Sequence, residues 1–139
     1  MAGRTVPKPS DQRRRRNKTT EVELPHEGHT GGFPPLPAWR EWRRDTVEWY
    51  AEWCRSPMAT EWLPVHFRRL HQVAVLYDDW LGSGDLNLAK ELRLQLEDFG
   101  GTPNALRRMG RKVAAPSAEV VRLPEKRAAR RLRAVDPAV

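Results

Sequence analysis

The sequence predicts an all-α fold: a small helical bundle or hairpin core of three main helices plus a short fourth, with disordered basic N- and C-terminal tails. Apolar residues recur every three or four positions through the middle of the chain, and no period-two strand pattern persists. Net charge is +3 over residues 1–37, −3 over 38–103 and +7 over 104–139. An apolar, mildly acidic centre with basic ends is typical of a folded core with two cationic extensions.

The 139 residues are enough for one folded domain with tails. Residues 1–37 are expected to be a disordered basic arm with a Pro-rich lead, because they combine clustered charge with few large apolar groups. A helical core and oligomerisation domain is expected over 38–113. A basic C-terminal tail follows over 114–139, in which residues 125–135 have the pattern of a basic helix.

The first helix is expected over residues 38–55, ending at Ser56-Pro57. Its positions at steps of 3, 4, 3 and 4 form one stripe, consisting of Trp39, Trp42, Thr46, Trp49 and Trp53. The opposite side is also apolar, with Val47, Tyr50 and Cys54. Because a small basic protein does not expose such a stripe, we interpret these tryptophans, with Trp62 and Trp80, as core or oligomerisation residues.

The remaining helices are marked by caps and apolar ridges. The second begins near Pro64 and ends at Gly82 and Gly84, and its stripe is Leu63, Phe67, Leu70, Ala74, Tyr77 and Leu81. The third is expected over 86–99 with Asp85 as its N-cap. Thr102-Pro103 opens a short fourth helix that carries Leu106, Met109 and Val113.

Nothing in the sequence supports catalysis, a metal site or a cofactor. His66 and His71 are five residues apart, whereas two zinc ligands on one helix face are four apart. Three aspartates could be considered as ligands of a divalent cation: Asp78, Asp79 and Asp85. Charge at a helix C-terminus and an N-cap explain them better. With one cysteine, Cys54, no intrachain disulfide is possible. We therefore expect a protein that is not an enzyme, with no secretory or membrane segment, located in the cytoplasm.

Basic residues point to a polyanionic partner. We name three groups: the basic arm (Arg13, Arg14, Arg15, Arg16 and Lys18), the 107–112 cluster (Arg107, Arg108, Arg111 and Lys112), and the tail arginines (Arg127, Arg130, Arg131 and Arg133). The first two are candidate DNA-binding residues, and the third fits DNA or an acidic partner. Solubilising tails remain the alternative. A helix-turn-helix at Gly82–Asp85 is also open, although the third helix offers few base-reading side chains and a plain hairpin fits better.

The motifs form an ordered series over residues 33–112. FPPLP leads into the tryptophan-rich segment and SPMA, followed by YDDW, GSGDL and ELRLQLEDFGGTPNALRRM. This series resembles the small subunit of phage terminases, in the group found in tailed phages of actinobacteria. The resemblance implies a non-catalytic helical protein that forms rings, of about eight to twelve subunits. It also implies recognition of double-stranded viral DNA at the packaging start site, in the host cytoplasm, and recruitment or regulation of the terminase large subunit.

One departure from the family concerns the N-terminus, because residues 1–37 show no helical periodicity where some small terminases carry a helix-turn-helix domain. The position of DNA on the ring therefore stays open. Two other hypotheses also remain: a small dimeric DNA- or RNA-binding regulator, and a scaffold whose basic tails bind acidic proteins.

Overall fold

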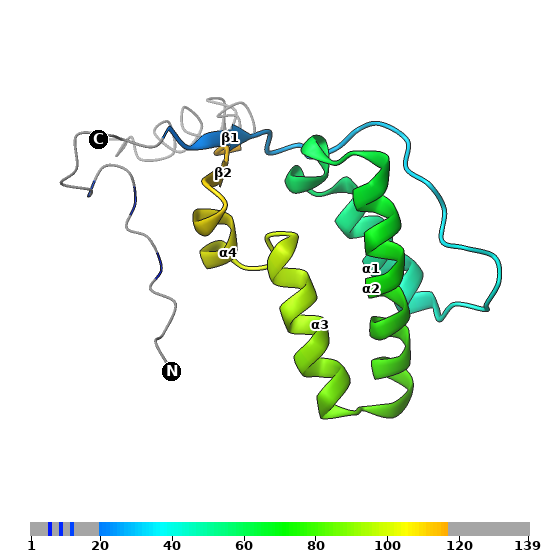
Figure 1. The fold of residues 1–139 in the computed structure, drawn as a ribbon. Coiled ribbons are helices and arrows are strands. Elements are labelled where there is room, and N and C mark those ends of the chain that lie inside the picture. The colour runs from blue at the N-terminus through cyan, green and yellow to red at the C-terminus, as the bar shows by residue number, and fades with distance from the viewer. Residues whose placement is uncertain (1–5, 7–8, 10–11, 13–19, 117–139) are drawn as a thin grey trace, which may run out of the picture.

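A computed structural model describes residues 6, 9, 12 and 20–116 of the chain. The described residues form three main helices, a short fourth helix and a two-stranded sheet. The sheet lies at one end of the molecule (Figure 1). In chain order the elements are β1 (Val22–Leu24), α1 (Arg44–Arg55), the 3-10 helix η2 (Pro57–Glu61), α2 (Pro64–Ser83), α3 (Leu86–Asp98), α4 (Pro103–Arg108) and β2 (Arg111–Val113). The predicted helical fold class is confirmed.

Helix α2 is the central element of the core. Pro64 occupies its first turn, and His66 Nδ1 accepts a hydrogen bond of 2.9 Å from the backbone N–H of Leu63. The helix ends at Gly84, whose φ of +66° is the left-handed conformation that favours glycine. Its buried residues are Phe67, Leu70, Val73, Ala74 and Asp78. Half of the predicted stripe is thus buried, and Tyr77 and Leu81 are half-buried. Leu63 lies outside the helix and is 61% exposed.

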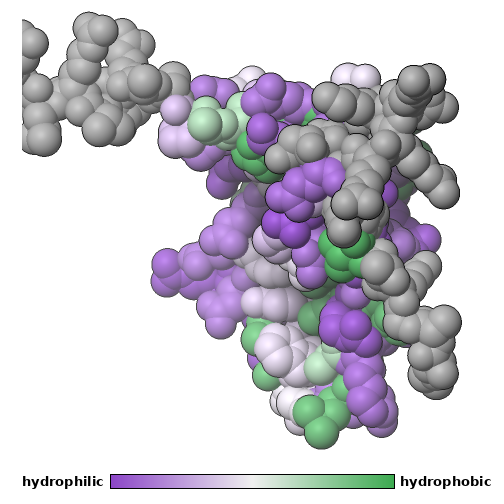
Figure 2. Space-filling model, turned by 90° about the vertical axis from the view of Figure 1, so that its left-hand side faces the viewer, coloured by the Kyte–Doolittle hydropathy of each residue, from purple (hydrophilic) through white to green (hydrophobic). Residues whose placement is uncertain are grey.

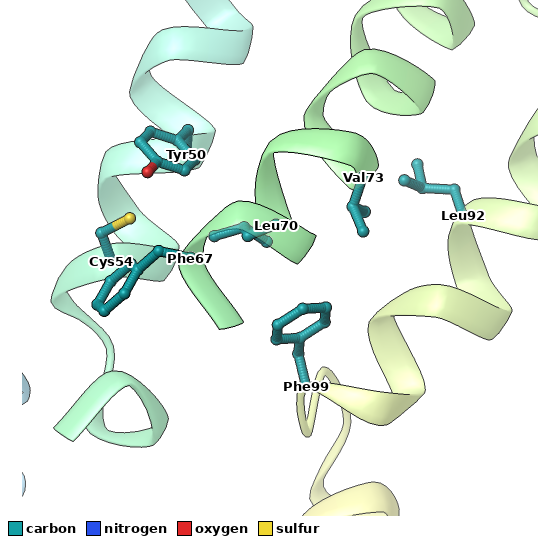
Figure 3. Packing of buried hydrophobic residues seen from close by; sticks show 7 residues of the cluster. All are labelled: Tyr50, Cys54, Phe67, Leu70, Val73, Leu92 and Phe99. Carbon is teal, nitrogen blue, oxygen red and sulfur yellow. The ribbon is translucent and has the colours of Figure 1, made fainter. Parts of the chain in front are cut away.

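The hydrophobic core draws on three helices, as Figure 3 shows. Tyr50 and Cys54 come from α1, Leu92 comes from α3, and Phe99 lies just after α3. Together with Phe67, Leu70 and Val73 of α2 they form one cluster. Full burial of one such side chain is worth about 1.5–3 kcal/mol, so this cluster supplies much of the energy that holds α1 and α3 against α2.

Two predicted caps are confirmed. The side chain of Asp85 accepts a hydrogen bond of 2.8 Å from the N–H of Asn87 at the start of α3. Thr102 Oγ1 accepts one of 3.1 Å from the N–H of Ala105 at the start of α4. Helices α2 and α3 run side by side in opposite directions (Figure 1). This arrangement is a plain helical hairpin, since a helix-turn-helix crosses at about 90–120°.

The first helix begins at Arg44, so the predicted start at residue 38 is wrong. Arg43 is extended, with φ of −61° and ψ of 146°, and its N–H donates to the Asp78 carboxylate at 3.1 Å. The side chain of Arg40 donates to the same carboxylate at 2.9 Å. Because the extended segment brings both donors to one acceptor on α2, this tertiary contact outweighs the local helical pattern.

A parallel two-stranded sheet was not expected. Val22 pairs with Arg111, Glu23 with Lys112 and Leu24 with Val113. Val113 therefore lies in β2 and not in the predicted fourth helix. Within the segment 1–37, predicted to be disordered, residues 22–24 are therefore in a strand, and Leu24 is buried. Strands of three residues are too short to display a period-two pattern, and the partner lies far away in the sequence.

Candidate nucleic-acid interface

The 107–112 cluster spans α4 and β2. Thr102 and Pro103 start α4, which ends after Arg108, and Gly110 with φ of +69° turns the chain into β2. No atom lies within 4 Å of a Cβ built on Gly110, so its role is conformational. This tight connection gathers the four basic residues within six positions, at the end of the molecule that carries the sheet (Figure 1).

Two of the four basic residues are already paired with carboxylates from neighbouring elements. Arg108 Nη1 lies 3.3 Å from Glu97 Oε2 of α3, and both side chains are partly buried. Arg111 Nε lies 2.6 Å from Glu61 Oε2 of η2. These ion pairs tie α4 and β2 to the helical core. They also neutralise half of the cluster, so Arg108 and Arg111 are weaker candidates for phosphate binding than the sequence alone indicates.

Arg107 and Lys112 are the better candidates. Both are exposed, and within the described part of the chain neither forms an ion pair. Arg107 Nη1 makes a hydrogen bond of 3.3 Å with Asn104 Oδ1. Together with Arg111, both line a surface hollow of about 660 Å³, which Glu21 also borders. Figure 2 shows the side of the molecule that lies at the left in Figure 1, and most of its coloured surface is hydrophilic. Arg107 and Lys112 are two exposed cations, and such groups are suited to contacts with a phosphate backbone.

A buried polar contact fixes the segment before α1. Asp78 is 3% exposed, and its carboxylate accepts hydrogen bonds from Thr46 Oγ1 at 2.6 Å, Arg40 Nη2 at 2.9 Å and the Arg43 N–H at 3.1 Å. Arg40 also donates to Asp79 at 2.8 Å. Burial acts to raise the pKa of the Asp78 carboxyl, but these hydrogen bonds and the nearby arginine charges hold it below its ordinary value.

Comparison with known proteins decides the family. A family model for the phage terminase small subunit matches residues 3–136. The chain belongs to the phage terminase small subunit family. Searches among curated proteins and among solved structures found no match. This small terminase subunit therefore acts in phage DNA packaging and virion assembly.

The six tryptophans of the terminase subunit occupy different environments. Four of them pack against the core: Trp49, Trp53, Trp62 and Trp80. Trp42 is half-buried and its Nε1 donates to the Pro37 carbonyl at 2.7 Å, whereas Trp39 is 69% exposed. Both precede α1, so the predicted five-residue helical stripe does not exist. The fully buried face of α1 consists of Thr46, Tyr50 and Cys54, and Val47 is 46% exposed.

Two histidines have structural partners. His66 accepts the Leu63 N–H at the start of α2. Tyr50 Oη donates to the Pro34 carbonyl at 2.6 Å and lies 2.9 Å from His71 Nε2. Burial lowers the pKa of His71 and outweighs the Pro34 backbone, which acts to raise it. The Arg68 charge lowers it further, so the neutral imidazole is favoured. Burial also raises the pKa of the Cys54 thiol to about 11, so this thiol is unreactive at neutral pH.

The basic arm (13–18) and the tail arginines (127–133) lie outside the described residues. Within the described part, no group of three or more His, Cys, Asp or Glu side chains is placed to hold a metal ion. No helix there is both long and apolar enough to cross a membrane. Sequence reasoning missed the Arg40–Asp78 contact. The available signal was a charged residue four positions after Ala74, on the buried stripe of α2.

Proposed function

We propose that this subunit is a non-catalytic adaptor of the DNA-packaging motor. It binds double-stranded viral DNA at the packaging start site, and it recruits or regulates the large subunit that carries the ATPase and nuclease. The family match carries this proposal. The exposed cations Arg107 and Lys112 support it, because they lie at the end of the subunit where the segments bearing the basic arm and the tail arginines join the fold.

The roles of the basic groups follow from their charge. The basic arm and the 107–112 cluster hold DNA phosphates, with Arg107 and Lys112 contributing most within the cluster. The tail arginines contact DNA or the large subunit. The tryptophan-rich core supports assembly into a ring in the host cytoplasm. Binding to phosphates releases counterions, so the affinity of such a surface falls steeply with salt concentration.

Neutralising Arg107 and Lys112 is expected to weaken DNA binding and to flatten its salt dependence together. Each phosphate contact contributes about 0.9 to the slope of log K against log salt, so the double variant Arg107→Gln/Lys112→Gln is expected to lose about 1.8 from the slope. Fluorescence anisotropy with a labelled duplex at several salt concentrations measures this. The arm variant, with Arg13 to Arg16 changed to Gln, is expected to lose about 3.6.

The matched control is Arg44→Gln/Lys90→Gln, which removes the same charge from exposed positions on α1 and α3. Its salt slope is expected to stay near that of the unaltered protein. If the control and the Arg107/Lys112 variant lose equal affinity, only the overall charge matters and the 107–112 cluster is not an interface. An unchanged slope in the arm variant removes the arm from the proposal.

The ring predicts a particular mass in solution. A subunit has a mass of 16.1 kDa, so a ring of eight to twelve copies has a mass of about 130 to 190 kDa. Light scattering after size exclusion of nuclease-treated protein measures it. A stable dimer of about 32 kDa, both alone and with DNA, would contradict the ring and favour a dimeric DNA- or RNA-binding regulator.

A further inference from the structure

Three aromatic rings form a continuous half-exposed surface on α1 and α2. Trp49 stacks on Tyr77, with centroids 4.4 Å apart and planes 8° apart. Tyr77 lies 5.9 Å from Trp80 in a tilted arrangement. All three pack against the core, yet each keeps part of its surface open to solvent. We call these three residues, together with Asp45 and Glu52 of α1, the acidic aromatic face.

Asp45 and Glu52 lie one helical turn before and one turn after Trp49 on α1. They are seven residues apart on α1 and therefore lie on the same side of that helix, next to the side that carries Trp49. Both are exposed, and within the described residues neither forms an ion pair, whereas Glu48 pairs with Arg44. Burial raises the pKa of Tyr77, and the charges of Asp45 and Glu52 raise it further.

The chemistry of this face suits a guanidinium group. An arginine placed over a tryptophan or tyrosine ring gains a cation–π interaction of about 0.5–1 kcal/mol at an exposed site. A carboxylate beside the ring adds a charge-assisted hydrogen bond. Phosphate groups are repelled by the same two carboxylates. The face is therefore complementary to an arginine-rich peptide and unsuited to DNA.

Such a peptide is present in this chain. Residues 125–135 carry the tail arginines together with Ala128, Leu132 and Val135, and residues 104–139 have a net charge of +7 against −3 for 38–103. Arg127 lies eleven positions after Pro116, the last described residue, and this length of chain spans up to about 36 Å when extended. Helix α2, with 20 residues, is about 30 Å long, so the extended connection is longer than the longest helix of the described residues.

We propose that the acidic aromatic face binds the arginine-rich segment 125–135 of this chain. The arginines stack on Trp49, Tyr77 and Trp80 and pair with Asp45 and Glu52. This binding goes beyond the proposed function, since it gives the segment a site on the subunit itself. An arginine held on this face is not available to DNA or to the large subunit at the same time.

The test uses the full-length protein labelled with 5-fluorotryptophan and observed by fluorine NMR, without DNA. The resonances of Trp49 and Trp80 are assigned from the variants Trp49→Phe and Trp80→Phe. Changing the four tail arginines to glutamine is expected to shift both resonances and to leave that of Trp62 unchanged, because Trp62 packs between Phe67 and Phe99. The matched control changes Arg13 to Arg16 to glutamine and removes the same charge from the other end of the chain.

A reciprocal variant tests the acidic side of the contact. Asp45→Asn/Glu52→Gln is expected to shift the same two resonances, and combining it with the tail variant is expected to add little. Its control, Glu23→Gln/Glu91→Gln, removes two exposed carboxylates from β1 and α3 and is expected to leave them unchanged. About 1 M salt screens charges beyond about 3 Å. It is expected to shift the Trp49 and Trp80 resonances of the unaltered protein toward those of the tail variant.

Two results would overturn this proposal. The first is a tail variant whose Trp49 and Trp80 resonances match those of the unaltered protein, or shift equally in the arm control. The second is a change in solution mass in Asp45→Asn/Glu52→Gln without any resonance shift in the tail variant, which would assign the face to a contact between copies. Neither readout involves DNA, so failure here leaves the proposed DNA-packaging function untouched.

Discussion

Replacing Asp78 with alanine is expected to lower the free energy of unfolding by about 3 kcal/mol, because three buried or half-buried donors lose one acceptor. Thr46 is fully buried and donates to Asp78 at 2.6 Å, so its hydroxyl would be left without its partner. Of its two carboxylate partners, Arg40 would keep only Asp79. Urea denaturation monitored by circular dichroism measures the change.

Asp79→Ala is the matched control. Its side chain is 47% exposed, and its contact with Arg40 is a surface ion pair, so a loss below about 1 kcal/mol is expected.

The pH dependence of stability further distinguishes Asp78→Ala from Asp79→Ala. The pKa of Asp78 is lowered in the folded chain, so its contribution is fully present above about pH 4 and is lost as pH falls through the folded pKa. Equal losses in both variants, or unchanged acid sensitivity in Asp78→Ala, would contradict this account.

Gly28→Ala is expected to cost about 3 kcal/mol of folding free energy, for two separate reasons. The residue has φ of +75°, which costs a non-glycine residue about 1–2 kcal/mol. A Cβ at this position would also lie 2.0 Å from the carbonyl oxygen of Arg55, so the backbone would have to move, at a cost of about 1–3 kcal/mol. The neighbouring His29 N–H donates to that same oxygen at 3.1 Å and would be displaced with it.

Gly84→Ala separates the two causes. Gly84 has a similar φ of +66°, but no atom lies within 4 Å of a Cβ built there. Its expected cost is therefore the conformational part alone, about 1–2 kcal/mol. Thermal or urea unfolding of both variants gives the comparison. If Gly28→Ala costs no more than Gly84→Ala, the segment before α1 is not held tightly against the end of that helix.

Features that depend on neighbouring residues were predictable from the sequence. The N-caps Asp85 and Thr102 each bond to a backbone N–H within three residues, so a short motif identifies them. The start of α2 at Pro64 and its end at Gly84 were equally local. The family resemblance was also carried by motif order and was confirmed by the match over residues 3–136.

Features that depend on distant contacts were not predictable. The start of α1 is set by Asp78, which lies more than thirty positions later in the chain. In the candidate interface, Arg108 and Arg111 look equivalent to Lys112 in the sequence. Their pairing with Glu97 and Glu61 appears only once α4 is placed against the core. A charge count therefore overstates the number of cations that this cluster offers to DNA.

The parallel sheet has a consequence for the order in which the chain folds. Val22 and its partner Arg111 are 89 residues apart, and closing a loop of that length costs about 4 kcal/mol in chain entropy. β1 is synthesised before β2 exists, so it cannot pair until translation has passed Val113. All the helices lie between the two strands in the chain, so their packing shortens the distance between the strands and lowers this entropic cost.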